Sequence, residues 1–265
     1  MPELTPPKLT LPKPRQEDPR LFELFGKALS TGRPAKMVII GFPCDLGVAR
    51  NGGRLGAAEA PDAIRNLLYR FTPDAQNAAE YIELVKNCRD LGNLVVGSDL
   101  EKAQAELGAV IAPHLANGSA VIILGGGHET SYGHFLGYVE AKKKAVRILN
   151  WDAHPDLRPL TEGKGHSGSP FRQACEHPSG YCKSYSAAGL LPHSCSESHL
   201  QLLRQIGGNL WFSEQINKVT INEIYRSVAP EMVSFDLDAL DQAYAPGVST
   251  PAAGGLSPDV WLHAA

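Results

Sequence analysis

The sequence predicts an α/β fold in which a mainly parallel central sheet lies between two layers of helices. Short apolar runs, bounded by glycine or polar residues, alternate with longer amphipathic segments along the chain. Such runs are typical of buried strands and such segments of helices, and their alternation favours a parallel sheet covered on both faces. The composition agrees, because 265 residues of which 43% are hydrophobic can bury a large core.

The first half of the chain is expected to contain strands and helices separated by a long shaped loop. The loop is predicted over Gly47–Pro61, which holds four glycines, and Pro61 suits the first turn of the helix that follows. Pro113 is expected to kink its helix or end it early. In chain order, the predicted elements are strand Met37–Pro43, helix Asp62–Tyr69, helix Leu100–Asn117, strand Ala120–Leu124 and helix Tyr132–Lys144.

The second half is expected to continue the same alternation around a long irregular segment. Leu160–Ser186 is rich in glycine, serine, histidine and proline, and this predicts an active-site loop region. The other predicted elements are strand Ala145–Leu149, helix Ser198–Ile206, strand Asn209–Phe212, helix Ile221–Val228 and strand Met232–Phe235.

The first twenty residues differ in composition from the rest of the chain. They carry four prolines within the first thirteen positions, with charges between them. Residues 1–20 are therefore expected to form an exposed tail or an arm that lies on a neighbouring surface. No repeat or linker divides the remainder, so residues 21–265 are predicted to form one α/β domain.

Charge and cysteine usage exclude several classes of protein. The formal net charge is −3, so neither a nucleic-acid partner nor binding to an anionic membrane is expected. The apolar runs are too short to span a bilayer, and the N-terminus lacks the apolar core of a signal peptide. Cys175, Cys182 and Cys195 share one segment, but their spacing does not fit the common zinc motifs, so ordinary thiols are favoured. A cytoplasmic location is predicted.

Three of the predicted strands end in clusters of metal-ligating side chains. Ligands of open α/β sheets bind just beyond the carboxyl ends of the strands, and alternate residues of an extended segment point the same way. Each cluster alone is also typical of a turn or a helix cap, but three at strand ends are harder to explain in that way. The candidate ligands are His128, Asp152, His154, Asp156, Asp236 and Asp238.

These candidates offer oxygen and imidazole ligands without a thiolate. The set suits Mn²⁺ and, less selectively, Fe²⁺, Co²⁺, Ni²⁺ or Zn²⁺. The four aspartates among the candidates balance the charge of two divalent cations. Two such cations can share a bridging hydroxide and lower its pKa towards neutrality, which makes it a nucleophile for an electrophilic carbon. Asp241, three residues beyond Asp238, is a candidate for orienting a ligand or a loop.

The motifs resemble those of the ureohydrolase family, which includes arginase, agmatinase and formimidoylglutamase. The resemblance covers nearly the whole chain. It implies an arginase-like three-layer fold with two Mn²⁺ per chain, divided among the six candidate ligands, and hydroxide attack on a C=N carbon of a small-molecule substrate. The matching motifs are Gly126–Glu129, Asp152–Asp156, Ser234–Asp241, the pattern Gly53, Gly56, Pro61 and Arg65, and Ser249–Pro251 with Gly254–Leu256.

Within the family, Asp156–Pro159 and Gly165–Gln173 resemble formimidoylglutamase. That resemblance implies hydrolysis of N-formimidoyl-L-glutamate to L-glutamate and formamide, a step of histidine degradation. The charge of Arg158 supports the same choice within the family, because Arg158 stands where arginases have a neutral asparagine. An arginine there would repel a cationic guanidinium substrate and could bind a glutamate carboxylate bidentately. Arg172 is a second candidate for a carboxylate, and the alternative for both arginines is an ion pair with a structural acid.

Two further side chains are candidates for proton transfer. Asp156 could take a proton from the hydroxide. His166 could pass one to the leaving nitrogen, since histidine titrates near neutral pH, or it could donate a hydrogen bond to substrate. The plain alternative is a solvated loop histidine. Glu129 is expected to cap a helix or to support a ligand.

The resemblance leaves two alternatives open. The family continues beyond the position that matches Ala265, through a strand with a glutamate expected to hold the nitrogen-bearing head of the substrate. A catalytically inactive or ligand-binding relative is therefore one alternative to the enzyme. A guanidino hydrolase of the arginase or agmatinase type is another. Family members commonly form trimers, hexamers or other assemblies, so a homo-oligomer is expected.

Overall fold

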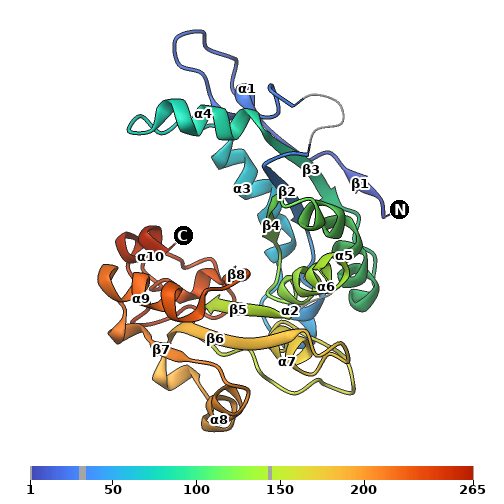
Figure 1. Cartoon of the computed structure of the whole chain (residues 1–265), viewed down its shortest axis with the longest axis vertical. Coiled ribbons are helices and arrows are strands. Elements are labelled where there is room, and N and C mark those ends of the chain that lie inside the picture. The colour runs from blue at the N-terminus through green and yellow to red at the C-terminus, as the bar shows by residue number, and fades with distance from the viewer. Residues whose placement is uncertain (1, 30–33, 143–144, 265) are drawn as a thin grey trace. The chain divides into compact units, whose positions relative to one another are not determined.

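The structure, a computed structural model, describes residues 2–29, 34–142 and 145–264. Its contacts group the chain into two compact units (Figure 1). The first unit comprises Met1–Leu46 and Gly56–Lys142, and the second comprises Gly47–Leu55 and Lys143–Ala265. Within the described residues, each unit contains one four-stranded sheet. The prediction of a single domain over residues 21–265 stays a prediction.

The sheet of the first unit is parallel except at one edge. Its strands have the order β1-β3-β2-β4, in which β2 pairs in parallel with both β3 and β4. The short β1 pairs with β3 in the antiparallel direction. The strands are β1 (Leu4–Thr5), β2 (Met37–Phe42), β3 (Cys88–Leu94) and β4 (Ala120–Gly125).

Helices cover both faces of this sheet. Ile40 and Phe42 of β2 pack into an apolar cluster with side chains of α5, whereas Gly41, on the other face, lies against Arg65 of α3. Helix α6 packs along α5, as Figure 1 shows. The helices that belong to this unit are α1 (Leu21–Leu24), α3 (Ala60–Leu68), α4 (Ala78–Lys86), α5 (Leu100–Ala116) and α6 (Thr130–Lys142), and α2 (Leu46–Arg50) lies at a unit boundary.

The sheet of the second unit is parallel throughout, with the strand order β7-β6-β5-β8. Leu149 and Trp151 of β5 pack against α9 and α10 on one face. On the other face, Phe171 of α7 stacks on Tyr185 of β6. The elements are β5 (Val146–Trp151), β6 (Cys182–Leu190), β7 (Leu210–Phe212), β8 (Met232–Phe235), α7 (Pro170–Cys175), α8 (Glu197–Gln205), α9 (Lys218–Val228) and α10 (Pro258–Ala264).

The predicted fold class, an α/β protein with mainly parallel strands between helix layers, is confirmed. Most predicted elements lie within a few residues of their observed bounds. One prediction is wrong, because Leu160–Ser186 is not a continuous loop but contains α7 and the first half of β6. Pro113 does not end its helix, which continues for three residues to Ala116. Residues 143–144 of the predicted helix Tyr132–Lys144 lie outside the described residues.

The N-terminal segment forms an arm along the first unit. Beyond the pairing of β1 with β3, the backbone N–H of Thr10 donates to Asn66 at 2.7 Å. Asn66 in turn donates to the carbonyl of Lys8 at 3.0 Å, and Arg70 donates to the carbonyl of Thr10 at 2.8 Å. The contacts of Leu4–Thr10 therefore fix this part of the segment to the first unit, and the tail or arm over residues 1–20 stays a prediction.

All five cysteines are free thiols, and the Sγ atoms of Cys175 and Cys182 lie 3.4 Å apart. None of the candidate metal-binding groups among the described residues includes a cysteine. In the described part of the chain, no helix combines the length and the apolar character that crossing a membrane requires.

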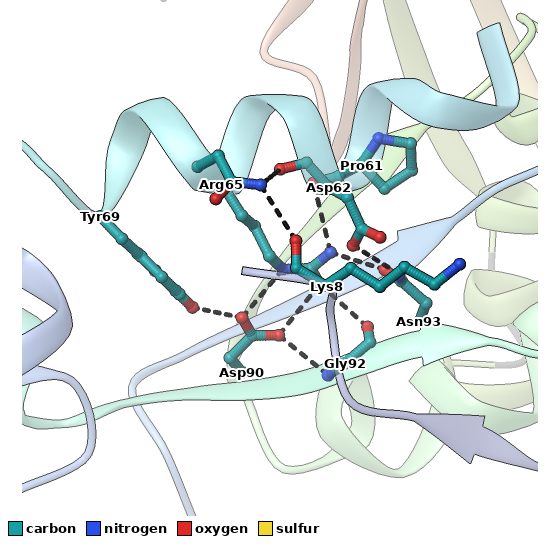
Figure 2. A network of polar contacts seen from close by, with 9 residues as sticks. Lys8, Pro61, Asp62, Arg65, Tyr69, Asp90, Gly92 and Asn93 are labelled. Carbon is teal, nitrogen blue, oxygen red and sulfur yellow. Dashed lines mark hydrogen bonds and ion pairs between the residues drawn. The ribbon is translucent and has the colours of Figure 1, made fainter. Parts of the chain in front are cut away.

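A buried arginine joins α3 to β3 in the first unit (Figure 2). The side chain of Arg65 is fully buried, and its guanidinium holds both carboxylate oxygens of Asp90 at 2.9 Å. The remaining N–H groups donate to Asn93 Oδ1 at 2.6 Å and to the carbonyls of Gly92 and Pro61 at 2.9 and 3.4 Å. A guanidinium has five N–H donors, and here each has an acceptor.

The surroundings of Arg65 are shaped to fit it. A Cβ atom on Gly41 would lie 1.9 Å from Asn93 Oδ1 and 2.8 Å from Arg65 Nη1, so only glycine leaves room for this contact. The Tyr69 hydroxyl also donates to Asp90. The position of Arg65 in the family motif thus has a structural explanation, because this residue fixes a helix to the sheet.

Candidate metal centre

Two of the predicted ligand clusters lie side by side in the second unit. Strands β5 and β8 pair in parallel, with Trp151 opposite Phe235. Asp152 directly follows β5, and Asp236 directly follows β8. Because parallel strands share the edge at which they end, both clusters lie at the carboxyl edge of the sheet, where α/β proteins bind ligands.

The structure brings Asp152, His154 and Asp238 together. The Nδ1 atom of His154 lies 3.3 Å from Asp152 Oδ1 and 3.1 Å from Asp238 Oδ2. One ligand atom from each of the three residues lies within 4.8 Å of the others. Both aspartates are buried, with 1% of Asp152 and 8% of Asp238 exposed. Buried carboxylates around an imidazole are suitable ligands for a divalent cation.

The electrostatics of this cluster suit a bound cation. Burial, together with the charges of Asp236 and Asp152, raises the pKa of Asp238 far above the usual range of a carboxyl group. Burial alone would lower the pKa of His154, but its hydrogen bonds to Asp152 and Asp238 outweigh this effect and raise that pKa to about 11. The cluster therefore holds protons more tightly than the free side chains would, and a bound metal ion would take their place as the balancing charge.

Metal affinity is consequently expected to rise with pH. Metal binding must displace the protons that the raised pKa values of His154 and Asp238 keep on the cluster, so it releases protons. The affinity for Mn²⁺ should fall by about one decade per pH unit for each proton released as the pH is lowered from 8 to 6. Calorimetric titrations of the metal-free protein with Mn²⁺, in buffers of different ionisation enthalpy, measure the affinity and the number of protons released. A pH-independent affinity would contradict the expectation.

The structure describes the backbone around the other predicted ligands, Asp236, Asp156 and His128. Asp236 accepts the backbone N–H of Asp238 at 3.0 Å, which orders the turn after β8. Asp156 has a φ of +44°, in the left-handed region that few residues other than glycine adopt. His128 belongs to the first unit, in the turn between β4 and α6, so its role beside the ligands of the second unit stays a prediction.

The turn that carries His128 packs closely against the end of β2. The backbone N–H of Gly127 donates to the carbonyl of Cys44 at 2.8 Å, and a Cβ on Gly126 would lie 2.0 Å from the same oxygen. Glu129 is fully buried, and Gln104 donates to its carbonyl at 2.7 Å. The glycines before His128 therefore allow a close backbone approach, and Glu129 is an interior residue of the first unit.

Arg158 is tied to a segment more than a hundred residues earlier in the chain. Its Nη1 donates to Asn51 Oδ1 at 3.1 Å, and Asn51 Nδ2 donates to Ser167 Oγ at 3.0 Å. Arg50 Nη1 donates to the carbonyl of Gly165 at 2.9 Å. The guanidinium of Arg158 is thus held by a neutral amide rather than by a structural acid. Asn51 was not a sequence candidate, since one asparagine in a glycine-rich stretch carries no distinguishing signal.

His166 is a buried residue of this loop, with 2% of its surface exposed. Its Nε2 lies 3.1 Å from the carbonyl of Pro159, and its Nδ1 accepts the backbone N–H of Gly168 at 3.1 Å. Burial lowers the pKa of His166, and the charges of Arg158 and Arg50 act in the same direction despite the opposing bond to Pro159. The ring is therefore neutral at neutral pH and hydrogen-bonded on both sides, which excludes the solvated alternative.

Arg172 has an acidic partner on its own helix. Its Nε forms an ion pair with Glu176, one turn later on α7. This ion pair is the alternative to substrate binding, so the substrate role of Arg172 stays a prediction.

Two buried residues near the cluster had no signal in the sequence. Asn150, within β5, donates to Asp152 Oδ2 at 2.9 Å and to the hydroxyl of Tyr185 at 3.2 Å. Tyr185, within β6, donates to the carbonyl of Pro155 at 2.7 Å. Asn150 lies two residues before Asp152 in the chain, whereas Tyr185 lies beside the cluster because β5 pairs with β6, with Ile148 opposite Tyr185.

Comparison with known proteins identifies the family. A profile of the arginase family matches residues 35–265. The formimidoylglutamase of Geobacillus kaustophilus (strain HTA426) is 35% identical over 254 residues, which cover 91% of this chain and 74% of the relative. The formimidoylglutamase of Rhodococcus jostii (strain RHA1) is 37% identical over 237 residues, which cover 84% of this chain and 71% of the relative.

Solved structures of similar proteins support the same family assignment. The crystal structure of Trypanosoma cruzi formiminoglutamase with Mn²⁺ superposes with a TM-score of 0.82 at 33% identity, over 93% of this chain and 84% of that chain. Proclavaminate amidino hydrolase from Streptomyces clavuligerus gives a TM-score of 0.75 at 26% identity, over 88% of this chain and 78% of that chain. The predicted resemblance to ureohydrolases, and to formimidoylglutamase among them, is confirmed. The chain belongs to the arginase family and is a hydrolase that acts on an amidine C–N bond.

Proposed function

We propose that this chain hydrolyses N-formimidoyl-L-glutamate to L-glutamate and formamide, with two Mn²⁺ per chain. The observation that carries the proposal is the buried cluster of Asp152, His154 and Asp238 at the carboxyl ends of two neighbouring strands. The relatives named formimidoylglutamase, and the Mn²⁺ in the Trypanosoma cruzi enzyme, support the substrate and the metal.

Six side chains would hold the metals. The cluster of the second unit supplies Asp152, His154 and Asp238, and we assign the remaining positions to His128, Asp156 and Asp236. When bound, two Mn²⁺ supply Lewis acidity and lower the pKa of an attacking water towards neutrality. Asp156 would accept the proton of that water as a bond forms to the formimidoyl carbon. The bond from this carbon to the glutamate nitrogen then breaks, and the nitrogen takes up a proton.

Arg158 would bind a carboxylate of the substrate. Its side chain is exposed, and the one hydrogen bond that the structure records for it among the described residues uses only Nη1, on Asn51. An arginine held by a neutral partner keeps its full charge and further donors, which suit a carboxylate. We keep Arg172 as a weaker candidate for the second carboxylate, because binding there would compete with Glu176.

His166 would deliver the proton to the departing nitrogen. For this its Nε2 must exchange the carbonyl of Pro159 for the substrate nitrogen. Because the pKa of His166 is lowered, the ring would first take up a proton from solvent, and the imidazolium would then donate its Nε2 proton to the departing nitrogen.

Replacing Arg158 by asparagine should weaken substrate binding selectively. Loss of a charge-assisted pair is expected to raise the KM for formimidoylglutamate by roughly 10- to 100-fold, or about 1.5–3 kcal/mol, with less effect on kcat. Metal content should not change. Arg204→Asn is the control, because Arg204 is half exposed and, among the described residues, pairs with the exposed surface residue Glu197, at 3.4 Å. An unchanged KM in the Arg158 variant would remove Arg158 from the substrate site.

A panel of substrates tests the proposed function directly. Purified chain loaded with Mn²⁺ is assayed with formimidoylglutamate, arginine, agmatine and guanidinobutyrate, and formamide and urea are quantified separately. Formamide from formimidoylglutamate alone is the expected result. Urea release without formamide would overturn the proposal in favour of a guanidino hydrolase, such as the structurally similar proclavaminate amidino hydrolase. No bound metal and no turnover would indicate an inactive relative.

A further inference from the structure

We propose that Tyr185 is a positioning residue of the metal centre, whose hydroxyl fixes the ligands Asp152 and Asp156 in place. The inference rests on the proposed Mn²⁺-dependent function and adds a residue that neither the sequence motifs nor the family resemblance singles out.

Tyr185 reaches the centre from a neighbouring strand. It lies on β6 opposite Ile148 of β5, and on the same face of the sheet as Asn150. Its side chain is fully buried, and its ring stacks on Phe171 of α7, with the ring centroids 4.4 Å apart and the planes 17° from parallel. A ring enclosed in this way cannot swing, so the position of its hydroxyl is set by the fold.

One hydrogen bond of that hydroxyl acts on Asp156. The hydroxyl donates to the carbonyl of Pro155 at 2.7 Å. This carbonyl belongs to the peptide plane between Pro155 and Asp156, and rotating the plane changes the φ of Asp156. That φ is +44°, in the left-handed region, which aspartate adopts more readily than most L-residues but which is disfavoured unless restraints such as local hydrogen bonds hold it there. The bond from Tyr185 is such a restraint, and it determines where the Asp156 side chain leaves the backbone.

A second hydrogen bond links the hydroxyl to Asp152. Tyr185 accepts from Asn150 Nδ2 at 3.2 Å, and the same amide donates to Asp152 Oδ2 at 2.9 Å. The other oxygen of Asp152 accepts the backbone N–H of His154 at 2.7 Å. The Asp152 carboxylate is thus oriented at both oxygens, and the orientation of Asn150 depends on Tyr185. One hydroxyl therefore connects two candidate ligands of the centre.

The alternative is that Tyr185 only stabilises the core of the second unit. Both roles predict some loss of stability when the hydroxyl is removed, because a buried carbonyl and a buried amide each lose a partner. Only the positioning role predicts a selective loss of metal affinity. Partners of metal ligands typically change affinity by about 10- to 100-fold when they are removed.

Tyr185→Phe removes the hydroxyl and keeps the ring stack. The matched control is Tyr225→Phe, on α9 of the same unit, because Tyr225 also accepts one hydrogen bond, from Trp151 at 3.3 Å, and donates another, to the Ala264 carbonyl at 2.6 Å. The metal-free wild type and both variants are titrated with Mn²⁺, with free Mn²⁺ followed by electron paramagnetic resonance. Unfolding temperatures are measured in parallel.

We expect the wild type to bind two Mn²⁺ per chain. Tyr185→Phe should bind Mn²⁺ about 10- to 100-fold more weakly. Tyr225→Phe should bind Mn²⁺ as the wild type does, although its unfolding temperature should fall by a similar amount. Asn150→Ala should weaken binding in the same way, and it decides the question if Tyr185→Phe does not fold. Wild-type affinity in the folded Tyr185 variant would overturn the positioning role alone. A wild type that binds no Mn²⁺ would overturn the proposed function and this inference with it.

Discussion

Replacing Asp238 by asparagine should nearly abolish Mn²⁺ binding and, with it, formimidoylglutamate hydrolysis. Asp238 lies in the buried cluster, 3.1 Å from His154 Nδ1, and the substitution removes a ligand charge without changing the shape of the side chain. Because outer partners of metal ligands already change affinity by about 10- to 100-fold, loss of a ligand should exceed about 100-fold. Metal analysis after gel filtration, together with formamide release, measures both effects.

Asp259→Asn is the control for the Asp238 variant. The Asp259 side chain is 74% exposed and pairs with Lys218, and the residue lies on α10 away from the predicted ligands in the sequence. Its substitution should leave Mn²⁺ content and turnover unchanged. Two tightly bound Mn²⁺ in a folded Asp238→Asn protein would show that the cluster is not the metal site.

Replacing Arg65 by methionine should be the most damaging change to the stability of the first unit. The substitution leaves the Asp90 carboxylate largely buried, with 14% of its side chain exposed, and without the guanidinium that holds both of its oxygens. Breaking a buried ion pair from one side destabilises a protein by about 3–5 kcal/mol. Urea unfolding followed by circular dichroism should show a markedly lower midpoint.

Arg204→Met makes the same chemical change at the surface. Arg204 and Glu197 are 52% and 67% exposed, and exposed pairs contribute about 0–1 kcal/mol. If Arg65→Met lowered stability no more than Arg204→Met, the network around Asp90 would contribute little to the fold.

The strands were predictable where their apolar residues are consecutive. Met232–Phe235 has the predicted bounds, and Ala120–Gly125 extends its predicted strand by one residue. Strand β6 was missed because its first residues are polar and the buried remainder is mostly small. Alanine, serine and glycine become interior residues there through the packing of neighbouring elements, which no local pattern of apolar residues reveals.

The metal ligands were predictable for a related reason. Asp152 and Asp238 come just after short apolar strands, so their clusters are visible as breaks in composition. Their proximity depends on the pairing of β5 with β8, which are separated by some eighty residues and by two other strands in the sequence. Tyr185 lacks even the local signal, because its role depends on which residue of β5 it faces.

The segment Gly47–Leu55 belongs to the second unit although residues of the first unit precede and follow it. Its partners, Ser167 and Gly165 among them, are more than a hundred residues further along the chain. During synthesis, this segment must therefore wait until the second half of the chain has left the ribosome before it can dock. Closing so long a loop is slow and entropically unfavourable, so the second unit should complete its folding late. A fragment that starts at residue 143 would also lack Asn51, the residue that holds Arg158, so the two halves are not separable by a single cut.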